Sequence, residues 1–276
     1  MHVRVNYRYV LRMVEIEQIA KLEAYLKRVK SEVDGIKFYP RRLDRYPFDT
    51  IASSMISKGF ALSSASVTLL REDLPDEAYG LSRSVVEGAL ILRYLTSDPS
   101  LQHDRAIEFA GFSFSYKNFW LHHAREQFAG KPEITEIERH ARQWKLTGDP
   151  KPAMRHWSKL RSFTWEAQTM PHPLDGPSLT QGFKIRQYAV DYFQTSQWVH
   201  CSQPALDNYV PELGRPFVVS GSSQNFGNPA HSVLYILLVH VHGILGYALF
   251  GLGIDRTAEI DSAFSETLAV IKPIGT

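Results

Sequence analysis

The feature that most constrains the fold is a long apolar run near the C-terminus. Residues 232–254 contain no Asp, Glu, Lys or Arg. A run of this length can cross a bilayer, but the central helix of a large bundle is also apolar on every side. His240 and His242 lie in the middle of the run, and four glycines interrupt it. We therefore expect a buried core helix, with a membrane-associated segment as the alternative.

The remainder of the chain predicts further helices and no sheet. Between residues 9 and 34, apolar side chains recur at helical spacing, among them Ile16, Ile19, Leu22, Leu26 and Val29. Comparable patterns and end signals predict helices at about 48–71, 73–96, 98–128, 132–146, 181–200, 229–251 and 256–271. Asp73 and Asp98, each shortly before a proline, are the expected N-caps of two of these helices.

These elements predict an all-α protein, a single-domain bundle of about eight to ten helices with an N-terminal helical extension. We expect residues 1–47 to form the N-terminal helix and a linker, and residues 48–276 to form the bundle domain.

Charge and cysteine content narrow the partners and the compartment. The chain has 31 basic and 29 acidic residues, so its net charge of +2 offers no broad positive field for duplex DNA. Cys201 is the only cysteine, which excludes an intrachain disulfide and fits a reducing compartment. The N-terminus also lacks the apolar run of a signal peptide. We expect a cytoplasmic protein without stable membrane association.

Several common chemistries have no motif in this chain. It contains no phosphate-binding loop, no Gly-x-Gly-x-x-Gly, no His-Glu-x-x-His and no Gly-x-Ser-x-Gly. The Glu-x-x-His pair of di-iron bundles is also missing. His122 and His123 are neighbours, but adjacent helical side chains diverge by about 100° and do not easily reach one ion. We therefore expect no metal and no cofactor.

Two polar stripes are the strongest functional signals. Arg83 and Glu87 lie four residues apart in an apolar stretch, and Tyr192, Ser196 and His200 follow one another at the same spacing. Residues four apart share a helix face. A buried guanidinium or carboxylate needs a partner, so we expect the two stripes to meet inside the bundle.

This polar centre has two interpretations. It is either a buried network that fixes the helix register or a functional site, because both arrangements bring charged groups together. In the second case Arg83, Glu87 and His200 are the candidate catalytic residues, with the imidazole as acid or base. The candidate ligand-binding residues are Tyr192, Ser196 and Ser202.

These residues resemble the signature of a bacterial all-helical family of unknown function. The run from Leu70 to Leu95 carries its Arg-x-x-x-Glu helix. Trp157-Ser158 resembles a tryptophan landmark, and Tyr192, Ser196 and His200, with Ser202 after them, resemble a Tyr-x-x-x-Ser-x-x-x-His element. The resemblance covers residues 50–205. It implies a fold with a shared polar centre and names no reaction.

The chain is also loosely similar to the helical superfamily of higher eukaryote and prokaryote nucleotide-binding domains. Enzymes of that superfamily cleave RNA without metal, using an Arg followed four to six residues later by a His, usually paired across a dimer. No arginine of this sequence has a histidine at that separation. The similarity therefore implies a site that only folding can assemble, and it extends the expected partners to RNA and a second copy of the chain.

Three functions follow from the sequence. The first is a binding or regulatory module for a small polar ligand, in a stress or phage-defence system. The second is a metal-independent RNase or hydrolase, with His200 as acid or base and Arg83 holding a phosphate or a developing anion. The third is a membrane-associated protein that uses residues 232–254.

Overall fold

The computed structural model describes residues 7–36, 47–143, 145–149, 163–167, 170–175 and 229–271. Within these ranges the chain is helical and has no strand, which confirms the predicted all-α bundle. The helices are α1 (Tyr7–Gly35), α2 (Pro47–Arg71), α3 (Pro75–Thr96), α4 (Gln102–Gln127), α5 (Glu133–Gln143), α9 (Pro229–Leu252) and α10 (Ala258–Ile271). A short helical turn covers residues 163–167.

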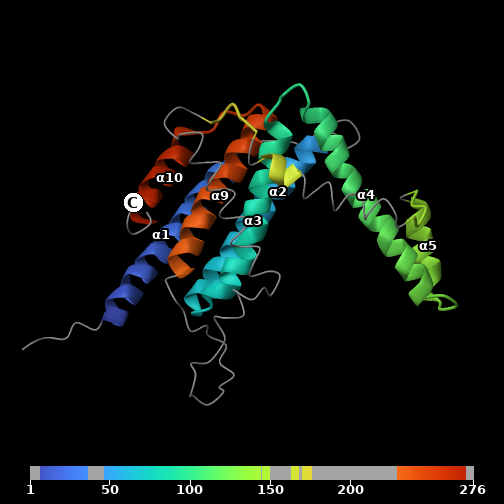
Figure 1. The fold of residues 1–276 in the computed structure, drawn as a ribbon, viewed down its shortest axis with the longest axis horizontal. Helices are drawn as coiled ribbons and strands as arrows, with labels where there is room; N and C mark the ends of the chain where they lie inside the picture. The colour runs from blue at the N-terminus through green and yellow to red at the C-terminus, as the bar shows by residue number, and fades with distance from the viewer. Residues whose placement is uncertain are drawn as a thin grey trace, which may run out of the picture.

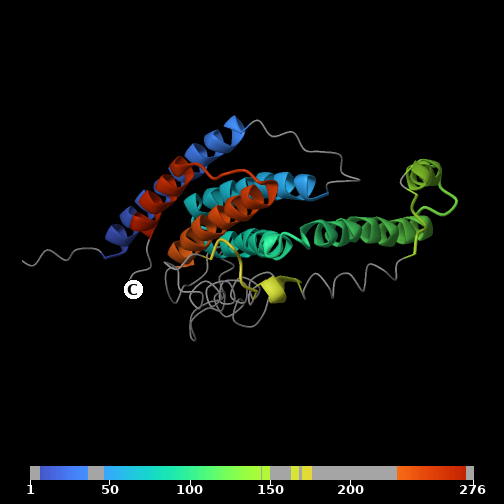
Figure 2. The ribbon, with the colours of Figure 1, turned by 90° about the horizontal axis from the view of Figure 1, so that it is seen from above.

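The helices form a packed body and a projecting arm. In the body α2, α3 and α9 pack against one another, and α1 lies beside α10 as an outer layer (Figures 1 and 2). Helix α4 runs away from this body, and α5 folds back against its far end (Figure 2). The body therefore holds the main core, while α4 and α5 form a separate surface.

Helix α9 is the core helix that the apolar run predicted. Val233, Leu234 and Leu237 are fully buried, and α9 makes its largest contacts with α3 and α2. Residues Ala230–Leu252 are long and apolar enough to cross a membrane, with mean hydropathy 2.0, but 72% of that apolar window is buried inside the protein. The central helix of a bundle can be as long and as apolar as a membrane span, because neighbouring helices cover most of its surface.

The two central histidines of α9 differ in environment. His240 is fully buried, whereas the side chain of His242 is 14% exposed. Their directions diverge as expected of residues two apart on a helix. His240 is thus the one that faces the core.

Helix α1 belongs to the same core. Its side chains Ile19, Leu22, Leu26 and Val29 are buried, as their spacing predicted. The pattern also placed Ile16 on this face, and that part of the prediction is wrong, because Ile16 is 60% exposed. The Gln18 side chain already donates to Val270 O, in the last turn of α10, so Ile16 lies past the helix that would cover it.

The predicted domain boundary at residue 47 stays a prediction.

Three helices end in the same hydrogen-bonded turn. After α2, Leu74 N donates to Leu69 O at 2.9 Å and Asp73 N to Leu70 O at 3.3 Å, with Asp73 at φ +62°. This pair of bonds is a Schellman motif, which needs a residue in the left-handed region. The same pattern closes α5 at Lys145 and α9 at Gly253.

Both predicted N-caps are wrong. Asp73 closes α2 instead, and Leu74 is the N-cap residue of α3, with Pro75 in the first turn. Asp98 forms a turn of its own by accepting hydrogen bonds from Ser100 N and Oγ, so α4 begins only at Gln102. Short polar side chains serve turns as readily as helix starts, because both offer nearby backbone N–H groups.

Gly251 lies where α9 packs closely against α2 and α3, so adding a side chain there should destabilise the protein. A Cβ at Gly251 would lie 2.6 Å from Thr96 Cγ2 and closer still to the Phe48 ring. We expect Gly251→Ala to lower the free energy of unfolding by about 1–3 kcal/mol, because both neighbours are buried and cannot move aside. Urea denaturation measures this.

Gly88→Ala is the matched control. Its Cβ would meet Ile244 Cδ1 at 3.5 Å and Met55 Sδ at 3.6 Å, which are ordinary contacts. Replacing glycine by alanine inside a helix is worth about 0.5–1 kcal/mol, so this variant should be at least as stable as the wild type. Equal stability of the two variants would contradict the assigned packing.

Candidate functional site

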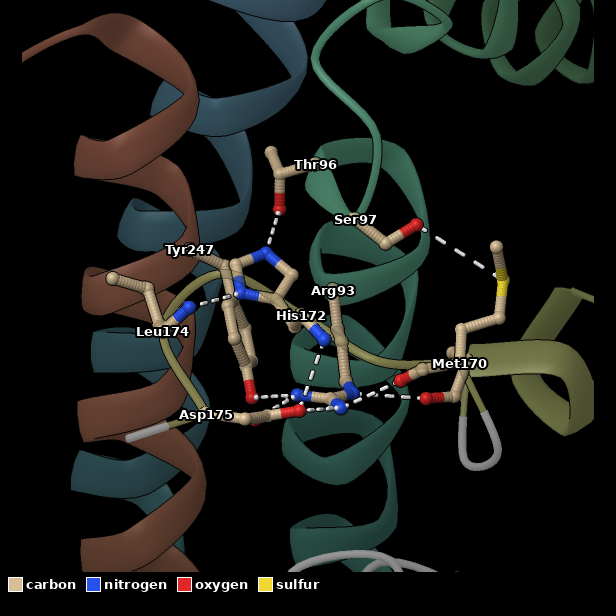
Figure 3. Close-up of polar contacts among 9 residues, drawn as sticks. Arg93, Thr96, Ser97, Met170, His172, Leu174, Asp175 and Tyr247 are labelled. Atoms are coloured by element: carbon tan, nitrogen blue, oxygen red, sulfur yellow. Dashed lines mark hydrogen bonds and ion pairs between the residues drawn. The ribbon is translucent and has the colours of Figure 1, made fainter. Parts of the chain in front are cut away.

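A buried ion pair joins α3 to the segment 170–175. The side chains of Arg93 and Asp175 are 1% and 3% exposed. Arg93 Nη1 donates to Asp175 Oδ1 at 2.7 Å and Nη2 to Oδ2 at 2.5 Å, so the contact is bidentate (Figure 3). Two parallel charge-assisted hydrogen bonds are the strongest way to hold a carboxylate on a guanidinium.

The other donors of Arg93 are also occupied. Nε donates to Ala167 O at 2.9 Å, Nη2 to Met170 O at 2.8 Å, and Nη1 to the Tyr247 hydroxyl at 3.0 Å. A guanidinium has five N–H groups, and all five have an acceptor. Burial alone would lower the pKa of Arg93, but the bonds to Asp175 and Tyr247 outweigh it and raise that pKa. Arg93 is therefore permanently charged and has no donor left for a ligand.

His172 completes this network. Its Nδ1 accepts a hydrogen bond from Leu174 N at 3.0 Å, and its Nε2 lies 3.0 Å from Thr96 Oγ1 (Figure 3). The Thr96 hydroxyl itself donates to Leu92 O at 2.7 Å. These contacts fit a neutral ring with its proton on Nε2, donating to Thr96. The edge contact with Tyr247, at 4.7 Å between ring centroids, fixes the ring plane.

We interpret this cluster as structural. It ties the segment 170–175 to α3 and α9 and leaves none of the guanidinium's donors free for chemistry. An arginine inside the run from Ala89 to Leu95 was the signal in the sequence that a charged partner had to exist. The partner, Asp175, lies inside a proline-rich break, between Pro173 and Pro177, where nothing in the sequence indicates a role.

The predicted polar centre is placed only in part. Arg83 and Glu87 both lie on α3 with partly buried side chains, one turn apart as expected. Tyr192, Ser196, His200 and Ser202 lie outside the described residues. The meeting of the two stripes therefore stays a prediction. The buried cluster around Arg93 is a different site, about 15 Å further along α3 from Arg83 at 1.5 Å per residue.

A second polar cluster connects α1, α9 and α10. His242 Nδ1 lies 3.4 Å from the Tyr25 hydroxyl, and its Nε2 lies 3.1 Å from Arg256 Nη1. Arg256 Nε is 2.7 Å from Asp261 Oδ1, and the Phe264 ring stacks on the imidazole at 3.9 Å. Burial is the main cause of the raised pKa of Tyr25. The cluster fastens α10 to the core helix.

His122, His123 and Glu126 form a cluster of side chains near the end of α4. The ligand atoms of the two histidines and a carboxylate oxygen of Glu126 all lie within 4.8 Å of one another. The two rings lie at the surface, and Phe119 packs edge-on against His123. Glu126 is four residues from one histidine and three from the other, so both rings turn toward it.

A groove of about 580 Å³ lies between α1 and α2. Apolar side chains of both helices line it, namely Leu26, Val33, Ile56, Phe60 and Val67. Charged residues of α1 lie at its edge. Three of them are already paired, Lys30 with Asp34 and Glu23 with Arg71 of α2. Lys27 also lines the groove and has no ion-pair partner among the described residues.

Comparison with known proteins identifies the family. A model described as a family of unknown function, DUF5677, matches residues 49–214. The chain belongs to the DUF5677 family. The match covers α2 to α5 and contains every predicted site residue from Arg83 to Ser202. No curated protein and no solved structure matches the chain.

Membership of DUF5677 confirms the expected family of unknown function and assigns no reaction. The matched range begins inside α2 and ends before α9. The core helix α9 and the outer layer formed by α1 and α10 therefore lie outside it.

The buried pair predicts a large effect of a small change. We expect Asp175→Asn to lower the free energy of unfolding by about 3–5 kcal/mol, because it keeps the shape but leaves the Arg93 charge buried without a counter-ion. Chemical denaturation measures this. Asp104→Asn, an exposed position on α4, is the control and should stay within about 0.5 kcal/mol of the wild type. An Asp175→Asn protein as stable as the control would contradict the assigned pair.

Proposed function

We propose that this DUF5677 protein is a binding module whose groove between α1 and α2 holds a small amphipathic molecule with one anionic group. The observation that carries the proposal is the groove itself. Small-molecule sites are typically concave, mostly apolar and about 300–1,000 Å³ in volume, with few polar groups that orient the ligand. The groove between α1 and α2, at about 580 Å³, lies in this size range, and Leu26, Ile56 and Phe60 give it an apolar wall.

Charge selects the kind of ligand. The charges of Lys30 and Glu23 are each paired with an opposite charge, on Asp34 and Arg71. Lys27 is left as a cation beside apolar walls. A ligand with an apolar body and a carboxylate, sulfonate or phosphate would satisfy both features.

We propose a regulatory setting for this binding, in stress or phage defence. This part of the proposal rests on the sequence resemblance. A cytoplasmic location is proposed with it, on the basis of the single cysteine, Cys201.

The groove is tested with 1-anilinonaphthalene-8-sulfonate, whose rings and sulfonate match the expected ligand class. We expect Ala61→Trp to abolish saturable binding, because Ala61 lines the groove and is exposed, so a larger side chain fills the space without disturbing the core. Lys27→Ala should weaken binding about fivefold, or roughly 1 kcal/mol. Fluorescence titration measures both.

Lys58→Ala, an exposed change on α2 away from the groove, is the control and should bind like the wild type. If Ala61→Trp binds the probe as the control does, the groove is not the site.

A second candidate function, metal-independent cleavage of RNA, is favoured by one observation. Arg83 and Glu87 keep partly exposed side chains on α3, although residues 88–96 of the same helix are all buried. A ligand can therefore reach this face. In this proposal His200 is the acid or base and Arg83 binds the phosphate.

We expect His200→Ala to reduce cleavage of a single-stranded RNA about 100-fold or more, with cleavage by the wild type unchanged by EDTA. A gel assay of labelled RNA measures this, and thermal unfolding confirms that the variant is folded. His103→Ala, an exposed histidine on α4, is the control. The nuclease proposal fails if the wild type leaves RNA intact or if His200→Ala cleaves at the control rate.

A further inference from the structure

We propose that His122, His123 and Glu126 of α4 form a binding site for a divalent transition-metal ion, and that Zn²⁺ suits their ligand set. The three residues lie in the last turns of α4. The far end of this helix projects away from the packed body (Figures 1 and 2). The proposal is independent of the groove and of the polar centre. It concerns side chains that neither of those functions uses.

The spacing of the ligand atoms matches a metal site. His122 Nε2 lies 3.4 Å from Glu126 Oε1, and His123 Nδ1 lies 3.6 Å from Glu126 Oε2. Zinc binds nitrogen and oxygen at about 2.0–2.2 Å in a tetrahedron, whose ligands are then about 3.3–3.6 Å apart. Because all three ligand atoms lie within 4.8 Å of one another, small side-chain rotations bring them around one ion.

Neighbouring rings hold the histidines in this arrangement. The Phe119 ring packs edge-on against His123, with 4.5 Å between centroids, and the two imidazoles lie 5.2 Å apart. Phe119 is one turn before His123 on the same helix face. The orientation of His123 therefore depends on packing as well as on its contact with Glu126.

The donor set distinguishes between ions. Two imidazole nitrogens and one carboxylate oxygen suit Zn²⁺, Co²⁺ or Ni²⁺, whereas Mg²⁺ and Ca²⁺ prefer oxygen ligands alone. Three protein ligands leave a fourth position for water, as in open zinc sites. The side chains of His122, His123 and Glu126 are 41%, 54% and 65% exposed, so this position faces solvent.

The test is a Zn²⁺ titration of the full chain in competition with a chromophoric chelator. We expect the wild type to bind Zn²⁺ at this site and Glu126→Gln to weaken that binding by about tenfold or more. The double variant His122→Asn, His123→Asn should lose the site. All of these side chains are exposed, so the unfolding temperature without metal should be unchanged.

His103→Asn is the matched control, since this histidine is exposed on the same helix but lies outside the cluster. It should bind Zn²⁺ like the wild type, and excess Mg²⁺ should not compete. The proposal is overturned if the wild type takes up no Zn²⁺. It is equally overturned if the Glu126→Gln protein and the double variant bind as tightly as the His103→Asn control.

Discussion

The buried pair of Arg93 and Asp175 is the interaction that fixes the segments 163–167 and 170–175 against the core. A charge removed from water is stabilised only if all its hydrogen bonds are satisfied. Arg93 meets this condition by contacting Ala167 and Met170 through their carbonyls and Tyr247 through its hydroxyl. These contacts converge on one guanidinium from three parts of the chain, so the pair specifies how the segments 163–167 and 170–175 meet α3 and α9.

Around this pair the core is built by close packing of α9. Helix α9 approaches α2 and α3 closely enough that Gly251 meets Phe48 and Thr96 without room for a side chain. Within the protein, 72% of the apolar window of α9 is buried by its neighbours. The outer layer of α1 and α10 adds to this core and carries its own polar cluster at His242.

The features with functional potential lie at the edges of this core. The groove is formed where α1 meets α2, the histidine cluster lies on the arm, and Arg83 and Glu87 lie on the less buried face of α3. The buried polar network, in contrast, has no free donor on its arginine. This separation matches the demands on each kind of group, because stability requires satisfied polar atoms and binding requires accessible ones.

The sequence alone determined the fold class and the core helix, because periodicity and composition are local properties of the chain. The family of unknown function was indicated by a resemblance of motifs, not by periodicity. It placed most helix ends within a few residues and failed at Asp73 and Asp98, where turns compete with caps. It also indicated a polar site on α3, but not that Arg93 pairs with Asp175, 82 residues later. Only the tertiary structure decided that pairing and the groove, because each depends on segments that are brought together by packing. The approach of His122 and His123 to Glu126 is local to α4, but it depends on side-chain rotamers that the sequence does not specify.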